Sequence, residues 1–371
     1  MRLVIRGENL FERAALRANF VPAPAFESMS GMALSGVLIA ITRLGLAARL
    51  AQRPATADEL ADELQLDREP TRLLLDCLHS VGYVDCRQGR YSLSRPARRW
   101  LASTSPSSVG QFVASCRDYW RHWSSLPEVL RNGVRFDHHG AGPDDPYWRE
   151  YITGQFELAR LSAPEVAKKV RLPAGARALL DVGGGHGWFA AQVCRRYPGL
   201  RATVIDLPGS ANVGREIIAD AGMSHQVEHR DGDALKADLG GSYDGALCFN
   251  LIHHLEPDQI VMLFSKIHAA LNPGGSLAVL DLFTQPPGRR PDAAGTWLGL
   301  FFYLTSGAQT YSPQQLRDWL REAGFDAPRR AQLRRIPSQT LYQATKHMSS
   351  PRPGCRDGRD AIAFGEKTRN A

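Results

Sequence analysis

The sequence predicts an α/β protein in which a helical winged-helix domain precedes a domain built on a mostly parallel sheet. The chain has 371 residues, which is too long for one ordinary domain of 100–200 residues. Its 43% hydrophobic and 22% charged residues are close to globular averages, so disorder is excluded for most of the length. From residue 176 onward, candidate strands alternate with helical stretches, as in proteins with a parallel sheet.

The first 100 residues are predicted to form the helical winged-helix domain. Leucines and isoleucines recur at helical spacing between residues 38 and 50. Thr56 and Glu59 then have the spacing of a capping box, and Asp67 is placed to cap a third helix. Two short strands around residues 88–89 complete the wing.

Residues 101–175 are expected to bridge the two domains. Helices are predicted over 106–125 and 146–170, and a loop rich in Gly, Pro and Asp separates them at 137–146.

Residues 176–346 are predicted to hold a mostly parallel sheet of seven strands. A helix is predicted over 312–324, because Ser312 can cap it, Pro313 suits its first position and Gly324 can end it. After residue 346 the segment is rich in Ser, Pro, Gly and charge, so 347–371 is expected to be a disordered tail. The predicted strands lie at 178–182, 202–205, 226–229, 243–249, 276–282, 330–335 and 340–345.

Charge and cysteine content narrow the class of protein. The net charge of +7 is diffuse and is therefore weak evidence for a nucleic-acid partner. The six cysteines form no Cys-x-x-Cys pair, so no structural metal site and no disulfide scaffold are expected. The most apolar stretch, 29–42, is shorter than a membrane span, and the N-terminus lacks the pattern of a signal peptide. We expect a cytoplasmic protein without a membrane partner.

A glycine-rich loop follows the strand predicted at 178–182. Asp181 lies at the end of that strand, and Gly183, Gly185 and Gly187 follow at alternate positions. A dinucleotide fingerprint would need glycine where Trp188 stands, so that reading is disfavoured. The loop is predicted to bind a ligand against bare backbone at the carboxyl edge of the sheet.

Two further acids follow the next strands. Asp206 ends the second predicted strand, where its carboxylate can accept bonds from both ribose hydroxyls of an adenosine-containing ligand. Asp233 follows the third strand and can accept a bond from an adenine amino group.

Five motifs in chain order resemble the S-adenosylmethionine-dependent O-methyltransferases of the caffeate/acetylserotonin type, including their bacterial small-molecule members. The resemblance covers about residues 29–346. It implies a class I methyltransferase (Rossmann-like) sheet of seven strands with the last one antiparallel, and S-adenosylmethionine as cofactor. It also implies a homodimer, because this family dimerises through its winged-helix segment. The motifs are Asp181-Val-Gly-Gly-Gly-His-Gly187, Asp206-Leu-Pro208, Gly232-Asp233, Leu251-Ile-His253-His254 and Leu271-Asn-Pro-Gly-Gly275.

The resemblance assigns cofactor roles to individual positions. It implies that Gly183 and Gly185 line the methionine part and that Asp206 holds the ribose. It places Asp233 and Ala234 beside the adenine, and Phe249 beside the adenosine.

The resemblance also implies a catalytic pair. His253 falls on the family's general base, and Asp281 falls on an acid that orients that histidine. The expected reaction is O-methylation of a hydroxylated, aromatic small molecule. Two positions depart from the plant pattern: His254 and Leu255 replace Asp and Trp, and a second orienting acid near Thr310 is absent.

The sequence does not decide the function of several other histidine and aromatic side chains. His138 and His139 lie on a Gly/Pro loop and are interpreted as solvated, while His186 has no assigned role. Aromatic residues expected to line an acceptor pocket, or else to form interdomain core, are Phe112, Tyr119, Trp120, Trp148, Trp297, Phe301, Phe302 and Tyr303.

Two alternatives remain open on the sequence. Some family members keep the cofactor but catalyse decarboxylation or hydroxylation without methyl transfer. A winged helix also occurs in DNA-binding regulators, although the outward face of its third helix carries the mixed set Arg68, Arg72, Asp76 and His79.

Overall fold

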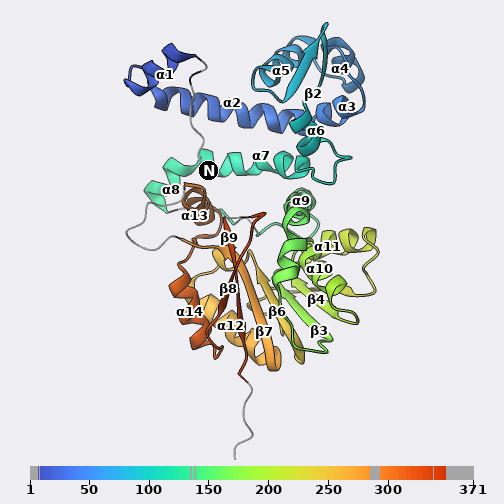
Figure 1. Ribbon diagram of the computed structural model, residues 1–371, viewed down its shortest axis with the longest axis vertical. Coiled ribbons are helices and arrows are strands. Elements are labelled where there is room, and N and C mark those ends of the chain that lie inside the picture. Colours follow the sequence, from blue (N-terminus) through green and yellow to red (C-terminus); the bar gives the residue numbers. More distant parts are fainter. Residues whose placement is uncertain are drawn as a thin grey trace, which may run out of the picture.

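The computed structural model describes residues 7, 9–133, 136–137, 139–284, 293–336 and 338–347. Helices and a small hairpin form one end of the molecule, and a twisted sheet flanked by helices forms the other (Figure 1). Two long helices, α7 (Gly110–Ser124) and α9 (Pro146–Lys169), lie between these ends. His138 and Cys355 lie outside the described residues, as does the tail predicted to be disordered, apart from His347.

The N-terminal end contains the predicted winged helix. The wing turns through Gln88 and Gly89, whose φ angles of +51° and +73° suit a two-residue hairpin turn. The elements are α1 (Leu10–Arg17), α2 (Ala23–Arg43), α3 (Leu46–Gln52), α4 (Ala57–Leu64), α5 (Arg68–Ser80), β1 (Val84–Arg87), β2 (Arg90–Leu93) and α6 (Arg95–Leu101).

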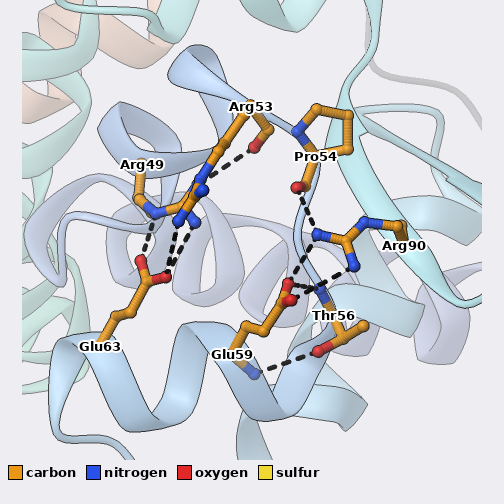
Figure 2. Close-up of polar contacts among 7 residues, drawn as sticks. All are labelled: Arg49, Arg53, Pro54, Thr56, Glu59, Glu63 and Arg90. Atoms are coloured by element: carbon orange, nitrogen blue, oxygen red, sulfur yellow. Dashed lines mark hydrogen bonds and ion pairs between the residues drawn. The ribbon is translucent and has the colours of Figure 1, made fainter.

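Charged side chains fasten the wing to the start of α4. The predicted capping box is present, with the Thr56 N–H donating to Glu59 over 2.8 Å and the Glu59 N–H donating to Thr56 over 3.1 Å. Arg90 of the wing then donates to Glu59 at 2.9 Å and to the Pro54 carbonyl at 3.1 Å (Figure 2). Beside this group, Arg49 of α3 pairs with Glu63 of α4 through both carboxylate oxygens.

Helix α2 is longer than the sequence pattern suggested. The apolar stretch 29–42 was expected to be too short for a membrane span, but the helix runs over 21 residues and is long and apolar enough to cross one by length and composition alone. That expectation about length was wrong, because residues before Met29 also join the helix. Only Ile41 is buried, while Phe26, Met29 and Met32 are exposed.

Two helices in close contact connect the ends of the molecule. These are α7 (Gly110–Ser124) and α9 (Pro146–Lys169), with the short α8 (Leu126–Asn132) after α7. The buried carboxylate of Glu157 on α9 accepts the N–H groups of Gln111 at 2.7 Å and Phe112 at 3.2 Å, which satisfies the start of α7. A Cβ at Gly154 would lie only 3.0 Å from the Ser115 hydroxyl, so glycine allows this close approach.

The C-terminal end is the predicted sheet of seven strands, in the order β5-β4-β3-β6-β7-β9-β8. The last strand in the chain, β9, runs antiparallel to β7, as predicted. The strands are β3 (Ala178–Val182), β4 (Arg201–Asp206), β5 (Val227–Asp231), β6 (Tyr243–Phe249), β7 (Leu271–Leu282), β8 (Arg329–Gln332) and β9 (Gln339–Thr345).

Helices cover both faces of this sheet (Figure 1). Alternate residues of β3 serve the two layers, since Leu179 packs with Phe189 and Val193 of α10 while Leu180 packs with Phe264 of α12. Burial on both faces explains why these strands read as continuous apolar runs. The helices are α10 (Trp188–Arg196), α11 (Pro208–Asp220), α12 (Pro257–Ala270), α13 (Ala293–Ser306) and α14 (Pro313–Glu322).

Candidate functional site

The carboxyl ends of four parallel strands meet along one edge of the sheet. β3 ends at Val182, β4 at Asp206, β5 at Asp231 and β6 at Phe249. The strand order reverses between β3 and β6, because β4 lies on one side of β3 and β6 on the other. In open α/β sheets, ligands bind outside the strand ends at this kind of switch point.

The glycine loop presents bare backbone at the switch point. Gly183, Gly185 and Gly187 have φ angles of +65°, +50° and +66°, which glycine adopts without steric cost. A Cβ at Gly183 would lie 2.9 Å from the Leu251 side chain, and a Cβ at Gly184 would lie 2.5 Å from the Asp181 carboxyl group. Side chains are therefore excluded on both sides of the loop.

Asp206 holds the loop from the neighbouring strand. Its Oδ2 accepts the Gly185 N–H at 2.6 Å, and its Oδ1 accepts the Leu207 N–H at 2.7 Å. Burial raises the pKa of Asp206, and these two N–H groups and the Ser210 hydroxyl oppose that shift. Asp206 thus links the loop to the end of β4.

Asp181 is a buried carboxyl group beneath the loop. Neither of its oxygens accepts a hydrogen bond from the described part of the chain. Burial, together with the nearby Asp206 carboxylate, raises the pKa of Asp181 to about 7, and the backbone N–H of Ala190, which is not in hydrogen-bonding geometry, opposes the shift. The ionised carboxylate therefore lacks a compensating hydrogen bond from the described residues.

The remaining predicted cofactor residues lie at the ends of β5 and β6. Asp233 Oδ1 accepts the Leu235 N–H at 2.9 Å, and the carboxylate pairs with Lys236 at 3.0 Å. Ala234 is half-buried beside it. Phe249 is buried, with its ring 5.2 Å edge-on from Phe189 in the core below the sheet. Its contact with an adenosine stays a prediction from its place at the strand end.

His253 and Asp281 form a buried pair. His253 lies in the 3-10 turn Ile252–His254, which follows β6, and Asp281 lies in β7. His253 Nδ1 and Asp281 Oδ1 are 2.7 Å apart, and the same oxygen accepts the Leu282 N–H at 2.7 Å. Because a carboxylate oxygen accepts, Nδ1 carries the proton and Nε2 of a neutral ring keeps a lone pair. The pair can therefore take up a proton at Nε2.

A tyrosine not singled out from the sequence fixes the backbone behind this pair. The buried Tyr311 hydroxyl donates to the Leu255 carbonyl at 2.6 Å, one residue after the 3-10 turn. Its neighbour Thr310, near which the family pattern has a second orienting acid that this sequence lacks, is buried near Gly299 of α13. From the sequence, Tyr311-Ser312-Pro313 predicted only the start of α14 and no role for the tyrosine.

An aromatic wall covers the histidine. The Phe302 ring stacks on His253, with centroids 3.7 Å apart and planes 17° from parallel. Phe301 meets Tyr119 of α7 at 4.7 Å. The Gln155 side-chain amide of α9 donates a hydrogen bond to the Tyr119 hydroxyl at 3.2 Å. Side chains from the bridging helices and from α13 thus converge here.

The other candidate aromatics are placed differently. Phe112 and Trp148 lie nearby, with Phe112 6.2 Å from Tyr119 and Trp148 packed over the start of α11. Trp120 and Trp297 are exposed, and Tyr303 is half-buried on α13.

His139 lies in the site, although its loop position indicated a solvated side chain. Its ring is 4.7 Å from that of His254, which in turn is 4.2 Å from that of His253. Burial, with a smaller effect of His253, lowers the pKa of His139 to about 4. A cavity of about 350 Å³ lies here, and the described residues that line it are Phe136, Asp137, His139, His254, Thr305 and Ser306.

His186 serves the glycine loop internally. Its Nδ1 accepts the Trp188 N–H at 3.0 Å, which caps the start of α10. Burial lowers the pKa of His186 to about 3. Across the described ranges, no three His, Cys, Asp or Glu side chains are grouped so that they could hold a metal ion.

The donor set fits the cofactor that the sequence resemblance implies. Asp181 offers two buried oxygens without partners, and Asp206 offers a second carboxylate at the same strand edge. Carboxylates suit a ligand with positive charge and ribose hydroxyls better than one with phosphates. Within the loop, Gly185 is the least crowded glycine, since a Cβ there would have its nearest neighbour, Ile152, 3.5 Å away.

Comparisons with known proteins agree with this geometry. The family model of the O-methyltransferase domain matches residues 131–326. The model of the O-methyltransferase dimerisation domain matches residues 26–103.

Individual relatives are similar over most of their length. The chain is 27% identical to the 3-hydroxy-5-methyl-1-naphthoate 3-O-methyltransferase of Streptomyces sahachiroi, over 80% of this chain and 87% of that protein. It is 28% identical to the N,N-dimethyltransferase OxyT of Streptomyces rimosus, over 82% of this chain and 90% of OxyT. The crystal structure of human N-acetylserotonin methyltransferase in complex with SAM shares the fold, with a TM-score of 0.77 and 21% identity. The match covers 93% of this chain and 100% of the human chain.

Proposed function

The chain belongs to the O-methyltransferase family, and from this premise we propose that it methylates a hydroxyl group of a small aromatic molecule with His253 as general base. The protein is an S-adenosylmethionine-dependent O-methyltransferase. The observation that carries the catalytic proposal is the buried pair of His253 and Asp281 under the Phe302 ring, at the same sheet edge as the glycine loop.

S-adenosylmethionine supplies a methyl group on a positively charged sulfonium. Within our proposal, Asp206 accepts bonds from the ribose hydroxyls, and Gly183 and Gly185 line the methionine part. Asp181 contributes negative charge beneath the loop. Asp233 and Ala234 flank the adenine, and Phe249 lies at the strand end next to the adenosine.

The proton of the acceptor hydroxyl goes to His253 Nε2. A phenol with a pKa near 10 is only about one part in a thousand ionised at pH 7, a deficit of roughly 4 kcal/mol. A positioned base contributes about 10² to 10⁴-fold, which offsets much of this deficit. Holding the oxygen in line with the methyl group contributes roughly 7–11 kcal/mol, so positioning by the aromatic wall is the larger effect.

An aromatic acceptor suits the lining. Phe302, Phe301 and Tyr119 offer ring surfaces on two sides, and the cavity beside His139 and His254 has the volume of a small-molecule site. The relative from S. sahachiroi is named for a hydroxylated naphthoate, whereas OxyT is named as an N,N-dimethyltransferase. Phenols and aromatic amines should therefore both be tried as acceptors.

The test is incubation with methyl-labelled S-adenosylmethionine and a panel of hydroxylated aromatics and aromatic amines, followed by mass analysis of acceptor and cofactor. We expect one added methyl group on a phenolic oxygen and release of S-adenosylhomocysteine. Product formed while the cofactor stays whole would instead support decarboxylation or hydroxylation.

We further propose that a second copy of this chain covers the apolar face of α2. The dimerisation family model includes this helix, and Phe26, Met29 and Met32 are exposed on it. Met29→Asp combined with Met32→Asp should give a monomer in sedimentation, whereas Ser28→Asp should leave the dimer intact. Recovery of the wild-type protein in the membrane fraction would favour α2 as a span and would contradict the cytoplasmic location that we propose.

The division into domains stays a proposal: 1 to about 100 for dimerisation, 101–175 as a bridge and 176–346 for the cofactor. A separate hydrophobic core running from Ile41 to Ala102 supports the first boundary. The same dimerisation domain accounts for the winged helix without DNA. Arg68 pairs with Asp62, and Arg72 pairs with Glu69 and Asp76, so these cations already have partners.

A further inference from the structure

The imidazole of His229 fills a slot behind the glycine loop. His229 lies on β5, the edge strand of the sheet, at the position paired with Val204 of β4. Its Nε2 is 3.0 Å from the Gly185 carbonyl oxygen. The ring thus reaches from the sheet edge to the back of the loop that faces the cofactor.

Two glycines make this slot possible. A Cβ at Gly187 would lie 2.9 Å from His229 Cε1, and a Cβ at Gly214 would lie 2.3 Å from His229 Nε2. Gly214 lies inside α11, where glycine costs about 1 kcal/mol relative to alanine. A Cβ at Gly214 would also lie 2.4 Å from the Gly185 carbonyl oxygen, so the helix carries an unfavourable residue where the bonded pair of His229 and Gly185 approaches it.

The carbonyl and the N–H of Gly185 are each held by a different strand. The N–H donates to Asp206 of β4 at 2.6 Å, and the carbonyl accepts from His229 of β5 at 3.0 Å. Gly185 has a φ of +50°, in the left-handed region. Two bonds on one residue fix both peptide planes around it, and Asp206 already faces the proposed ribose position.

The bond to Gly185 also defines the protonation of the ring. A carbonyl oxygen only accepts, so His229 Nε2 carries the proton, and in the neutral ring Nδ1 then has none. Nδ1 is buried and has no partner in the described part of the chain. The charged or titratable groups facing His229 are His186, Arg215 and Asp231, and burial is the main cause that lowers its pKa, to about 4. The neutral ring is thus the form that the folded protein holds.

We infer that His229 is a positioning residue that fixes the glycine loop, through the Gly185 carbonyl, in the conformation that binds S-adenosylmethionine. The inference rests on the binding of this cofactor at the loop. Under this inference His229 does not contact the reacting atoms. Removing its imidazole should therefore weaken cofactor binding and leave the chemical step intact.

Two substitutions separate the hydrogen bond from the packing. His229→Leu removes the donor and keeps similar volume, whereas His229→Gln keeps an N–H donor at about the position of Nε2. We expect His229→Leu to weaken S-adenosylmethionine binding at least tenfold in calorimetry and to raise its KM equally, with kcat at saturation within threefold of wild type. His229→Gln should recover most of the affinity. His225→Leu, at an exposed histidine before β5, is the matched control and should behave as wild type.

A second measurement reads the loop without turnover. Hydrogen exchange of the ligand-free enzyme over residues 183–187 should be at least tenfold faster in His229→Leu and near wild type in His229→Gln. If the leucine variant fails to fold, nitrogen NMR of the wild-type imidazole still tests the bond, because it must show the proton on Nε2. Equal affinity in all variants, equal loss in Leu and Gln, or a proton on Nδ1 would overturn the inference. A wild-type enzyme that does not bind S-adenosylmethionine would contradict the assigned function instead.

Discussion

His253 donates from Nδ1 to Asp281 across 2.7 Å, and the carboxyl group of Asp281 has no exposed surface. A charge-assisted hydrogen bond in a water-free site is stronger than the same bond at a surface. The acid therefore sets the tautomer of the histidine and the direction of Nε2. The same arrangement makes the two residues separable by mutation.

His253→Ala should lower kcat by about 10² to 10⁴-fold, because the acceptor then loses its proposed general base. Cofactor affinity should stay within twofold, since His253 has no proposed contact with the cofactor. Steady-state kinetics and calorimetry on one preparation check both statements. Full turnover in this variant would show that positioning alone supplies the rate.

Asp281→Asn should lower kcat by about a hundredfold or more while the fold is kept. An amide can donate to Nδ1 and so favours the tautomer with the proton on Nε2, which cannot act as a base. The pH profile is the decisive readout, because a purely structural defect would lower the rate equally at every pH. Loss of the rise of kcat with pH is the expected result.

Asp206→Ala should weaken S-adenosylmethionine binding at least tenfold, because it removes the proposed ribose contacts and the bond to the Gly185 N–H. Calorimetry measures the change. Asp220→Ala, at an exposed acid at the end of α11, is the control and should bind as wild type. Equal affinity in both variants would exclude Asp206 from the cofactor site.

The pKa of about 7 at Asp181 predicts a pH effect on stability. This value lies above the unfolded value of about 3.9, so the folded protein binds more protons between about pH 4 and 7. Stability of the ligand-free protein should therefore fall as the pH rises through this window, by at most about 4 kcal/mol from this group. Asp181→Asn should melt at a higher temperature than wild type at pH 8, and the difference should vanish near pH 4.

Cofactor binding should reverse this penalty. A cationic ligand favours the ionised carboxylate, so binding at pH 6.5 should release protons. The binding enthalpy should then vary with the ionisation enthalpy of the buffer in wild type, and the variation should be smaller in Asp181→Asn. A buffer-independent enthalpy in the wild type would show that Asp181 does not respond to the ligand.

Gly209→Ala should disturb the acceptor side of the site. A Cβ there would lie 2.2 Å from the ring of Trp148, whose Nε1 donates to the carbonyls of Ala141 and Gly142 in the loop that carries His139. Moving Trp148 releases this loop, so KM for the acceptor should rise several-fold. KM for S-adenosylmethionine should change less. Gly241→Ala is the control and should leave both KM values unchanged, because Gly241 is exposed, has no positive φ, and a Cβ there would meet nothing within 4 Å.

Much of the sheet could be predicted because its strands obey local rules. The strands 178–182 and 243–249 have the observed boundaries, since each is a short apolar run between turn residues. The predicted order of glycine loop and acids also follows from position alone, because parallel strands bring their carboxyl ends to one edge.

The acceptor side could not be predicted in this way, because it depends on contacts between distant segments. His139 was interpreted as solvated from its Gly/Pro loop. The loop is instead held against α13, where the Phe136 N–H donates to the Leu304 carbonyl at 2.9 Å. The role of His229 likewise needs three separate segments to meet, and no local pattern marks a histidine in an edge strand as a partner of Gly185.

Tyr119 and Phe301 touch across the boundary between the bridging helices and the sheet domain. The aromatic wall proposed to meet the acceptor is therefore assembled from helices, whereas the crevice proposed for the methyl donor is assembled from strand ends and the loops that follow them. Substitutions on α7 and α13 can reshape the first without touching the second. Substitutions of a few helical side chains could thus change which acceptor such an enzyme accepts, while the binding of the methyl donor stays the same.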